Sequence, residues 1–349
     1  MKKLAAYNLL PWDDLAIICK KLNFNDIFQL SAVCKDWRSF FKSYWKNSME
    51  FQSPLIVQRA SFSKKSLSFI SLSDNMSYSA QMDNFWSLSY SCSSSGYLIF
   101  VGPNMFMLMN PLTRRGKKIS TLALKDNDDY RGSRAHFAFV KGSKEYVLVF
   151  FSNGSCRLNV YQSQNSCWAI YSTKGDPLQV VDLVVFQNSI YVLTNKAKIG
   201  VLNLNSTSLK FVELKNTPSI TYNDLRLVSC DGNLLMVHFV PGKMLNMYRI
   251  DFSTMEFVRM DTLGELALFY SPYANCYALS NPRRWGYDSN TLYSITCSFP
   301  EYKVYSGNGK LQNHIRPDRG LQVPKRSILY WVDWYLPHLR DEVDYSLVE

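Results

Sequence analysis

Histidine is the residue in this sequence with the widest range of chemistry, because imidazole can be an acid, a base or a metal ligand near neutral pH. The chain has 4 histidines, His136, His238, His314 and His338. None stands at the H-x-x-x-H or H-E-x-x-H spacing of a zinc site on a helix. His136 and His238 fall in strand-like segments, where we favour a hydrogen-bonded structural role. We therefore expect no catalytic residue, no metal site and no cofactor.

Two loops have some features of ligand sites and fail in detail. The segment 126–129 begins like a calcium loop, but Arg131 stands at the sixth position and Phe137 at the twelfth, where Gly and Glu are needed. The segment 306–310 is rich in Gly but lacks the spacing of a phosphate-binding loop, so we expect a hairpin turn there. No serine lies in G-x-S-x-G, and no cysteine has a recognisable histidine partner. An enzyme that assembles its groups from distant loops remains an alternative.

The 8 cysteines contain no C-x-x-C pair and lie mostly in apolar runs. Buried free thiols in a reducing compartment are the interpretation that fits best. The longest apolar runs, such as 146–151, are far shorter than the roughly 18 residues of a membrane-spanning helix. The first ten residues have no small-residue cleavage site, so we expect no secretory signal. These features predict a protein of the cytoplasm or the nucleus, or both, with no membrane partner.

The formal net charge of +11 raises the possibility of nucleic-acid binding. The basic clusters are short and widely separated, at 64–65, 114–118, 283–284 and 325–326. Each is typical of a solvated strand end or loop, and the aromatic residues beside the last two are typical of sheet packing. A basic nucleic-acid-binding or scaffold protein is therefore the second hypothesis, and strong salt dependence of binding would support it.

The segment 10–22 predicts an amphipathic helix. Pro11 suits the first helical turn, and Asp13 and Asp14 lie at the positive end of the helix dipole. The apolar residues that follow have the spacing of one helix face: Leu15, Ile18, Cys19 and Leu22.

A second helical region is predicted from residue 26 to 44, with a break near Val33 and Cys34. Together these short helices carry more large apolar side chains than about 40 residues can bury alone. Either they pack on the following domain, or they bury part of their surface on another protein.

The ordered residues from Leu10 to Arg38 resemble an F-box, the three-helix unit that binds the Skp1 adaptor of cullin-RING ubiquitin ligases. We assign it to residues 5–50. The opening Leu-Pro and the Val-Cys-x-x-Trp-Arg segment carry the resemblance. Asp13 departs from the family pattern, where Glu is frequent. The resemblance implies adaptor-binding residues, which contact the adaptor or hold those contacts in place: Leu10, Pro11, Leu15, Ile18, Leu22, Leu30, Val33, Cys34 and Trp37.

Residues 54–349 predict an all-β domain of short apolar runs separated by turns. In the clearest unit, four strands joined by tight hairpins occupy residues 180–214, as in one blade of a β-propeller. A turn between first and second strands recurs every 43 to 46 residues, at Gly96, Gly142, Asn188, Gly232 and Asn275.

About six such units fit the domain, with five to seven allowed. The apolar runs at 55–57 and 327–331 are natural partners for closing the ring. We find no kelch or Trp-Asp signature. The fold class is thus α+β and multidomain, a three-helix F-box followed by an all-β propeller-like domain.

The phrase from Phe106 to Arg115, the hairpin at Asn188 and the terminal run from Trp331 to Pro337 resemble plant F-box proteins with a DUF295 domain. That resemblance implies a non-catalytic substrate-recognition subunit of an SCF-type ubiquitin ligase. Its partners would be a Skp1-type adaptor, a cullin reached through the adaptor, and an unknown target protein.

Overall fold

The computed structural model divides the chain into two compact units, Met1–Gln52 and Ser53–Glu349. The structure describes the following residues: 10–19, 22, 30, 33–48, 53–60, 66–72, 76–81, 88–111, 115–124, 130, 132–152, 154–172, 178–220, 224–240, 245–272, 274–295, 302–315, 329–337 and 340–345.

The first unit contains two described helices, α1 (Trp12–Cys19) and α3 (Lys35–Ser48). Pro11 lies directly before α1, one position earlier than predicted, and its carbonyl accepts the Leu15 N–H at 3.1 Å. The break predicted near Val33 and Cys34 is confirmed, because α3 begins directly after Cys34. The prediction of three helices is wrong for the described residues, which contain two. Most of the segment between the two helices lies outside the described residues.

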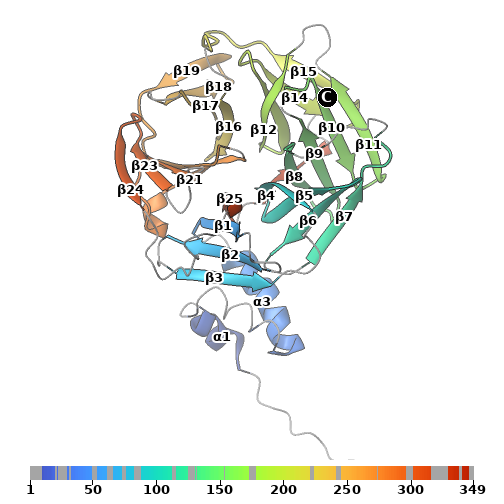
Figure 1. The fold of residues 1–349 in the computed structure, drawn as a ribbon, viewed down its shortest axis with the longest axis vertical. Coiled ribbons are helices and arrows are strands. Elements are labelled where there is room, and N and C mark those ends of the chain that lie inside the picture. The colour runs from blue at the N-terminus through green and yellow to red at the C-terminus, as the bar shows by residue number, and fades with distance from the viewer. Residues whose placement is uncertain are drawn as a thin grey trace, which may run out of the picture. The chain divides into compact units, whose positions relative to one another are not determined.

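The second unit is a six-bladed β-propeller, in which six sheets are arranged around a central axis (Figure 1). The prediction of about six units is confirmed. The first three blades along the ring consist of these strands: β25 (Leu329–Tyr335), β1 (Leu55–Ala60), β2 (Ser66–Ser71) and β3 (Met76–Gln81); β4 (Ser89–Ser94), β5 (Tyr97–Gly102), β6 (Met105–Asn110) and β7 (Arg115–Ser120); β26 (Glu342–Val343), β8 (Arg134–Val140), β9 (Tyr146–Phe151), β10 (Arg157–Gln162) and β11 (Cys167–Ser172).

The other three blades follow in chain order. They consist of these strands: β12 (Val180–Phe186), β13 (Ser189–Thr194), β14 (Ile199–Asn203) and β15 (Ser208–Val212); β16 (Leu225–Cys230), β17 (Asn233–His238), β18 (Asn246–Asp251) and β19 (Glu256–Met260); β21 (Cys276–Ser280), β20 (Leu266–Tyr270), β22 (Thr291–Ile295), β23 (Tyr302–Ser306) and β24 (Leu311–Ile315). We number the blades 1 to 6 in this order.

Blade 1 closes the ring, because it combines strands from both ends of the domain. β25 pairs antiparallel with β1, with Tyr335 opposite Leu55 and Val332 opposite Gln58. The predicted closure by the first and last apolar runs is confirmed at the level of strands, but the register differs, because residues 55–57 pair with 333–335 and Trp331 lies opposite Arg59. Such closure leaves no end blade with an uncovered hydrophobic face.

Blade 6 departs from the predicted succession of hairpins. β20 and β21 form the expected antiparallel hairpin at Asn275, but β22 then pairs with β20 in parallel. The connection passes through a short 3-10 helix, η2 (Pro282–Trp285), flanked by Asn281 and Gly286 in the left-handed conformation. This longer connection allows the chain to cross to the other edge of β20, which a two-residue turn does not.

The turns that set the repeat are local features of the sequence. Three of them place two successive residues in the left-handed region, as type I′ hairpins require. These pairs are Ser95–Gly96, Gln187–Asn188 and Asp231–Gly232. The turns predicted at these positions are confirmed.

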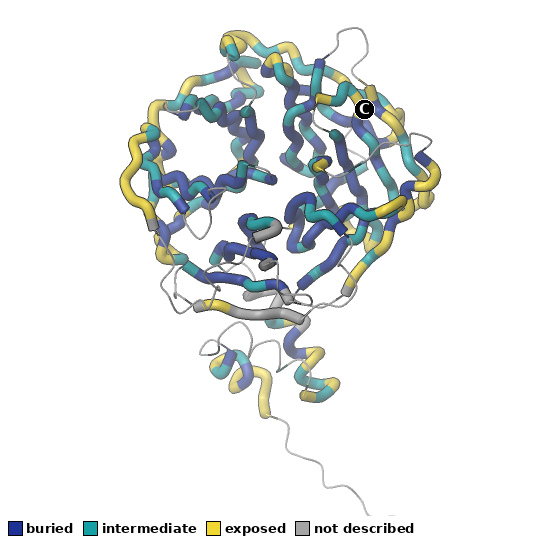
Figure 2. The backbone as a smooth tube through the Cα atoms, in the orientation of Figure 1, coloured by how far each residue is buried: buried dark blue, intermediate teal, exposed yellow. Residues whose placement is uncertain are grey.

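The hydrophobic core of the propeller lies in layers between neighbouring blades. Val149 and Val192 pack between blades 3 and 4, and Phe269 and Trp334 pack between blades 6 and 1. Figure 2 shows the buried backbone near the axis and the exposed backbone along the rim of the propeller. Among the described helices, none is long and apolar enough to cross a membrane.

Candidate functional site

The helical unit has a small core that holds α1 against α3. Leu15, Cys19 and Phe40 are buried in it, and Leu30 and Trp37 are partly buried against them. Of the predicted adaptor-binding residues, Leu15 and Trp37 therefore lie where they can fix the helices in place.

Other apolar side chains of this unit face solvent. The exposed fractions are 41% for Leu10, 47% for Trp12, 56% for Ile17 and 63% for Val33. Large apolar residues are rarely this exposed on a folded surface without a partner when several occur together. Of the remaining predicted residues, Pro11 is exposed, and Ile18 and Leu22 are half-buried.

Trp12 and Ile17 were not among the predicted binding residues. The signal that could have found Ile17 is its position on α1 away from the Leu15–Cys19 face, since a β-branched apolar residue on the polar side of a helix needs a reason. Trp12 contacts Phe40 in an edge-to-face geometry, with ring centroids 5.7 Å apart, and the rest of its ring remains exposed.

Cys34 acts at the start of α3. Its Sγ accepts the backbone N–H of Trp37 at 3.4 Å, and its carbonyl accepts the N–H of Arg38. The thiol thus occupies the place of an N-cap side chain, which is usually Ser, Thr or Asp. Its role in the described structure is to begin the helix that carries Trp37.

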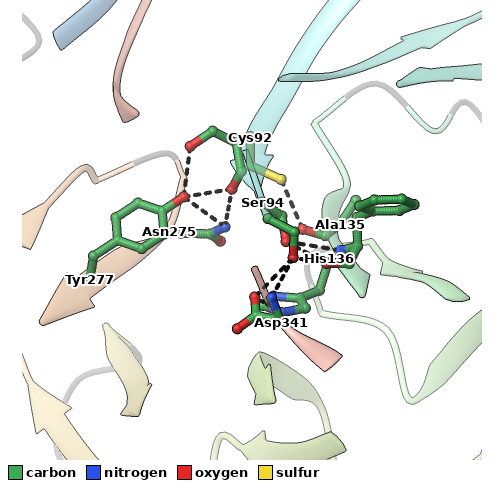
Figure 3. Close-up of polar contacts among 10 residues, drawn as sticks. Cys92, Ser94, Ala135, His136, Asn275, Tyr277 and Asp341 are labelled. Atoms are coloured by element: carbon green, nitrogen blue, oxygen red, sulfur yellow. Dashed lines mark hydrogen bonds and ion pairs between the residues drawn. The ribbon is translucent and has the colours of Figure 1, made fainter. Parts of the chain in front are cut away.

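In the propeller, polar side chains of β4 and of the turn after it bind the backbone of β8 and of Ser133 just before it, along the edge nearest the axis. The donors are serines and one cysteine, and the acceptors are alternate carbonyls of blade 3. These bonds run from Ser91 to Ser133 (2.6 Å), from Cys92 to Ala135 (2.8 Å) and from Ser95 to Phe137 (2.6 Å). Figure 3 shows Cys92 directed at the Ala135 carbonyl, with Asn275 and Tyr277 on the opposite side of β4.

Hydrogen bonds from side chains of one blade to the backbone of another also occur at the other blades. A strand nearest the axis has no neighbour on its inner side, so its buried backbone groups need other partners. Side chains from another blade supply them. The donors and their acceptors are Arg134 to Val181 O (3.1 Å), Arg226 to Pro272 O (3.2 Å), Asn275 to Ser93 O (2.8 Å), Ser93 to Trp334 O (2.7 Å) and Tyr335 to Gly96 O (3.1 Å), and the Asp182 carboxylate accepts from the Leu227 N–H (2.8 Å). The axis is therefore ringed by polar side chains that join one blade to another.

Two family models match this chain. The model of the KIB1-4 beta-propeller family matches residues 69–315, which is most of the chain. This protein belongs to the KIB1-4 β-propeller family. The F-box domain model matches residues 8–48, so the chain is an F-box protein with a KIB1-4 β-propeller.

The chain was also compared with curated proteins and with solved structures. None of the curated proteins matches this sequence. The crystal structure of Citrobacter koseri AztD is similar at 13% sequence identity and a TM-score of 0.37, over 65% of this chain and 60% of that one. This chain thus spans less than two thirds of the length of that solved protein.

Four charged residues form a compact cluster in the KIB1-4 β-propeller, across blades 3, 4 and 5. Arg226 Nη1 lies 2.7 Å from Asp224 Oδ1, and Arg134 Nη1 lies 3.9 Å from Asp182 Oδ1. Burial raises the pKa of Asp182, although both arginines oppose that shift. Tyr270 donates a hydrogen bond to Asp224. With two positive and two negative charges, the cluster is internally balanced, and we interpret it as structural.

Asp333 is the buried carboxyl group at the ring closure. The Tyr90 hydroxyl donates to its Oδ2 at 2.6 Å, and the Tyr90 ring stacks on Trp331 with centroids 3.9 Å apart. Burial raises the pKa of Asp333 to about 7, and hydrogen bonds from Tyr90 and Ser271 oppose that shift. The group joins blade 1 to blade 2 and, through Ser271, to blade 6.

The residues whose side chains could take part in catalysis or metal binding lie apart in the KIB1-4 β-propeller. His136 pairs with Asp341 at 3.0 Å, His238 is buried on β17 and His314 is exposed on β24. Burial raises the pKa of the Cys92 thiol to about 12, so it acts as a hydrogen-bond donor at neutral pH. Within the described ranges, no group of three His, Cys, Asp or Glu could hold a metal ion.

Two loop interpretations have different outcomes. The turn predicted at 306–310 is confirmed, since it joins β23 to β24 and Ser306 Oγ donates to Lys310 O at 3.1 Å. The segment 126–129, the clusters 64–65 and 325–326, and His338 lie outside the described residues.

Proposed function

We propose that this chain is the substrate-recognition subunit of an SCF-type E3 ubiquitin ligase. The helical unit would bind a Skp1-type adaptor and, through it, a cullin. The KIB1-4 β-propeller would bind a target protein. The observation that carries the proposal is the F-box match over residues 8–48, together with four exposed apolar side chains outside the packed core of that unit, Leu10, Trp12, Ile17 and Val33.

The contribution of such a subunit is proximity. A target held on the propeller is presented to a conjugating enzyme brought by other subunits, so its lysines meet the activated ubiquitin at high effective concentration. In this proposal the chain supplies affinity and geometry, and the bond-making groups belong to other proteins. It is therefore a non-catalytic receptor.

Three finer points belong to the same proposal. The resemblance of Phe106–Arg115 and Trp331–Pro337 to DUF295 proteins supports a plant source. The cysteines without C-x-x-C pairs support the cytoplasm, the nucleus or both. The target is expected to be a protein, with nucleic acid a less favoured ligand.

Adaptor binding is tested with two aspartate substitutions on the exposed face. Ile17→Asp and Val33→Asp place an unpaired charge at the proposed interface without touching the Leu15 core, so we expect each to weaken binding to a plant Skp1-type adaptor about 10-fold or more. Ser43→Asp, at an exposed position of α3, is the matched control and should bind like wild type. Co-purification followed by calorimetric titration measures the effect.

Failure of the wild-type chain to bind any Skp1-type adaptor would overturn the proposal. Leu15→Ala separates folding from binding, because it removes a fully buried side chain and should destabilise the helical unit by about 2–5 kcal/mol. Faster amide exchange in α1 and α3 would report that loss. Ile17→Asp should leave exchange in these helices unchanged.

A further inference from the structure

The backbone groups on the edge of β8 nearest the axis have two kinds of hydrogen-bond partner. Over its first half, side chains of β4 accept or donate the hydrogen bonds, ending at Phe137, whose N–H donates to Ser94 Oγ at 3.0 Å. Over its second half, backbone replaces side chains. The N–H of Phe139 donates to Asp341 O at 2.9 Å, and the N–H of Lys141 donates to Val343 O at 2.8 Å.

The backbone partner is β26, which pairs with β8 in parallel, Glu342 opposite Phe139 and Val343 opposite Val140. This is strand addition, in which main-chain bonds give affinity and alternate side chains give selectivity. The alternate residues Asp341, Val343 and Tyr345 contact β8, β4 and the core layer beside them.

Each of these three side chains meets a particular partner. Asp341 Oδ2 lies 3.0 Å from His136 Nε2, and Figure 3 shows the two side chains together. The Asp341 N–H donates to Ser95 Oγ at 3.0 Å. Val343 is 1% exposed and belongs to the core layer between blades 3 and 4. Tyr345 is partly buried against the same layer.

The flanking contacts extend the segment over blade 4. The Asp344 carboxylate lies 3.5 Å from Lys141 Nζ, and its N–H donates to Asn188 O at 2.9 Å. Asn205 Nδ2 donates to Tyr345 O at 2.8 Å. Residues 340–345 thus contact the turns of blades 2, 3 and 4, as a short bound peptide would.

Residues 340–345 are bound to the propeller by fewer buried contacts than the strands within a blade are bound to one another. Lys141 and Arg340 are each 55% exposed as side chains, so their charged contacts are partly solvated. Val343 is the fully buried side chain of the pair that forms β26. β8 itself is paired along its length with β9 on its other side. Release of β26 would therefore open two backbone donors without taking β8 out of its sheet.

We propose that this edge of β8 is a docking site for an extended acidic peptide, and that residues 340–345 occupy it as an intramolecular competitor. The peptide would carry an acidic residue, a small β-branched residue two positions later, an acidic residue next, and an aromatic residue after it. The inference rests on the proposed function only where it assigns this peptide to a target protein. An incoming target must compete with a segment already held at high effective concentration.

The test uses the full chain and a labelled peptide with the sequence of residues 340–345. Val343→Arg places a long charged side chain where the core has no room for it, so the segment should leave its site. We expect faster amide exchange at Phe139 and Lys141, and peptide binding by fluorescence anisotropy at least tenfold tighter than to wild type. A peptide with Arg in place of Val should not bind. Glu342→Gln, on the alternate side of β26, is the control and should behave like wild type.

A second variant separates release of the segment from a loss of folding caused by Val343→Arg. Asp341→Ala with Asp344→Ala removes the carboxylate contacts with His136 and Lys141 and leaves Val343 in the sequence, and it should show the same two effects to a smaller degree. Two results overturn the proposal: unchanged exchange at Phe139 and Lys141 in both variants, or faster exchange without peptide binding. Adaptor binding by the helical unit is measured alongside. If the peptide binds and no adaptor does, the docking site stands and the ligase role falls.

Discussion

Asp333 is the residue whose ionisation the propeller controls most directly. It lies on β25 with no exposed surface, and burial raises its pKa to about 7 from an ordinary value of 3.8. Donors from Tyr90, Ser271 and the backbone of Ser93 and Trp334 surround the carboxyl group. Those donors favour the charged form, and the cost of removing the charge from water outweighs them.

This shift predicts how stability depends on pH. Because the folded-state pKa is raised, the stabilising effect of the bound proton is fully present below the unfolded value of 3.8 and is lost as pH rises through about 7. Asp333→Asn does not titrate, so the stability of wild type relative to this variant should fall between pH 5 and pH 8, by about 1–4 kcal/mol. Thermal unfolding at several pH values measures the difference.

Asp251 gives a control of opposite sign. Hydrogen bonds from Ser253 lower its pKa, so its contribution is present above the unfolded value and is lost only as pH falls through the lowered folded value. Asp251→Asn should therefore differ from wild type by the same amount across pH 5 to 8. If the wild-type and Asp333→Asn curves run parallel over that range, Asp333 does not titrate there.

At the scale of elements, the serines of β4 and of the turn after it take the place of a neighbouring strand for part of β8. Ser94 Oγ both donates to Phe137 O and accepts from Phe137 N, each at 3.0 Å. Ser95 also donates to Phe137 O, so the carbonyl keeps a partner when Ser94 is changed, and the N–H does not.

Ser94→Ala should thus destabilise the propeller by about 1–3 kcal/mol, the usual range for leaving one buried backbone donor unpaired. Chemical denaturation of the full chain, with amide exchange at Phe137, measures the effect. Ser120→Ala is the control: it removes an exposed hydroxyl that accepts only the Leu122 N–H, and should cost less than about 0.5 kcal/mol. Equal losses in the two variants would contradict a special role for β4.

The elements differ in how far sequence could predict them. The hairpins at Gly96, Asn188 and Gly232 depend on local turn chemistry, so they could be found from the residues alone. β22 pairs in parallel with β20 because the connection through η2 carries the chain to the other edge of β20. No pattern in the neighbouring residues predicts that crossing. The same holds for β26, two residues whose partner strand lies about 200 positions earlier in the chain.

In the helical unit, spacing predicted the Leu15 and Cys19 face correctly, because burial on a helix follows its period. It did not separate the side chains that stay exposed from those that hold the helices together. That distinction depends on how α1 and α3 pack, which leaves Trp12 and Ile17 exposed and buries Leu15.

At the scale of the propeller, stability depends on ring closure at β25. Trp334 has no exposed surface, packs edge-to-face on Phe269 with centroids 4.9 Å apart, and donates from Nε1 to Tyr270 O at 3.2 Å. It therefore joins the closing strand to blade 6 by both packing and a hydrogen bond. The sequence predicted that apolar runs at opposite ends of the domain would close the ring, but it placed the closing residues at 327–331 rather than at 333–335, and it did not indicate which side chain would carry the contact.

Trp334→Ala should lower the stability of the propeller by about 3–5 kcal/mol, because it leaves a large cavity and removes the Nε1–H bond to Tyr270 O at the closure. In a closed ring each blade depends on both neighbours, so the loss should be shared. We expect amide exchange to become faster in blade 4, on β13, as well as in β1 and β21, with a single unfolding transition for the propeller.

Trp168→Ala is the comparison for that prediction. Trp168 lies on an outer strand, is partly exposed and bridges only blades 2 and 3, through its Nε1–H bond to Ser120 O at 2.7 Å. Its loss should cost about 1–3 kcal/mol and leave exchange on β13 close to wild type. If Trp334→Ala instead loosened only β25 and β1 while β13 kept its protection, the blades would unfold independently, and ring closure would not be the source of the propeller's cooperativity.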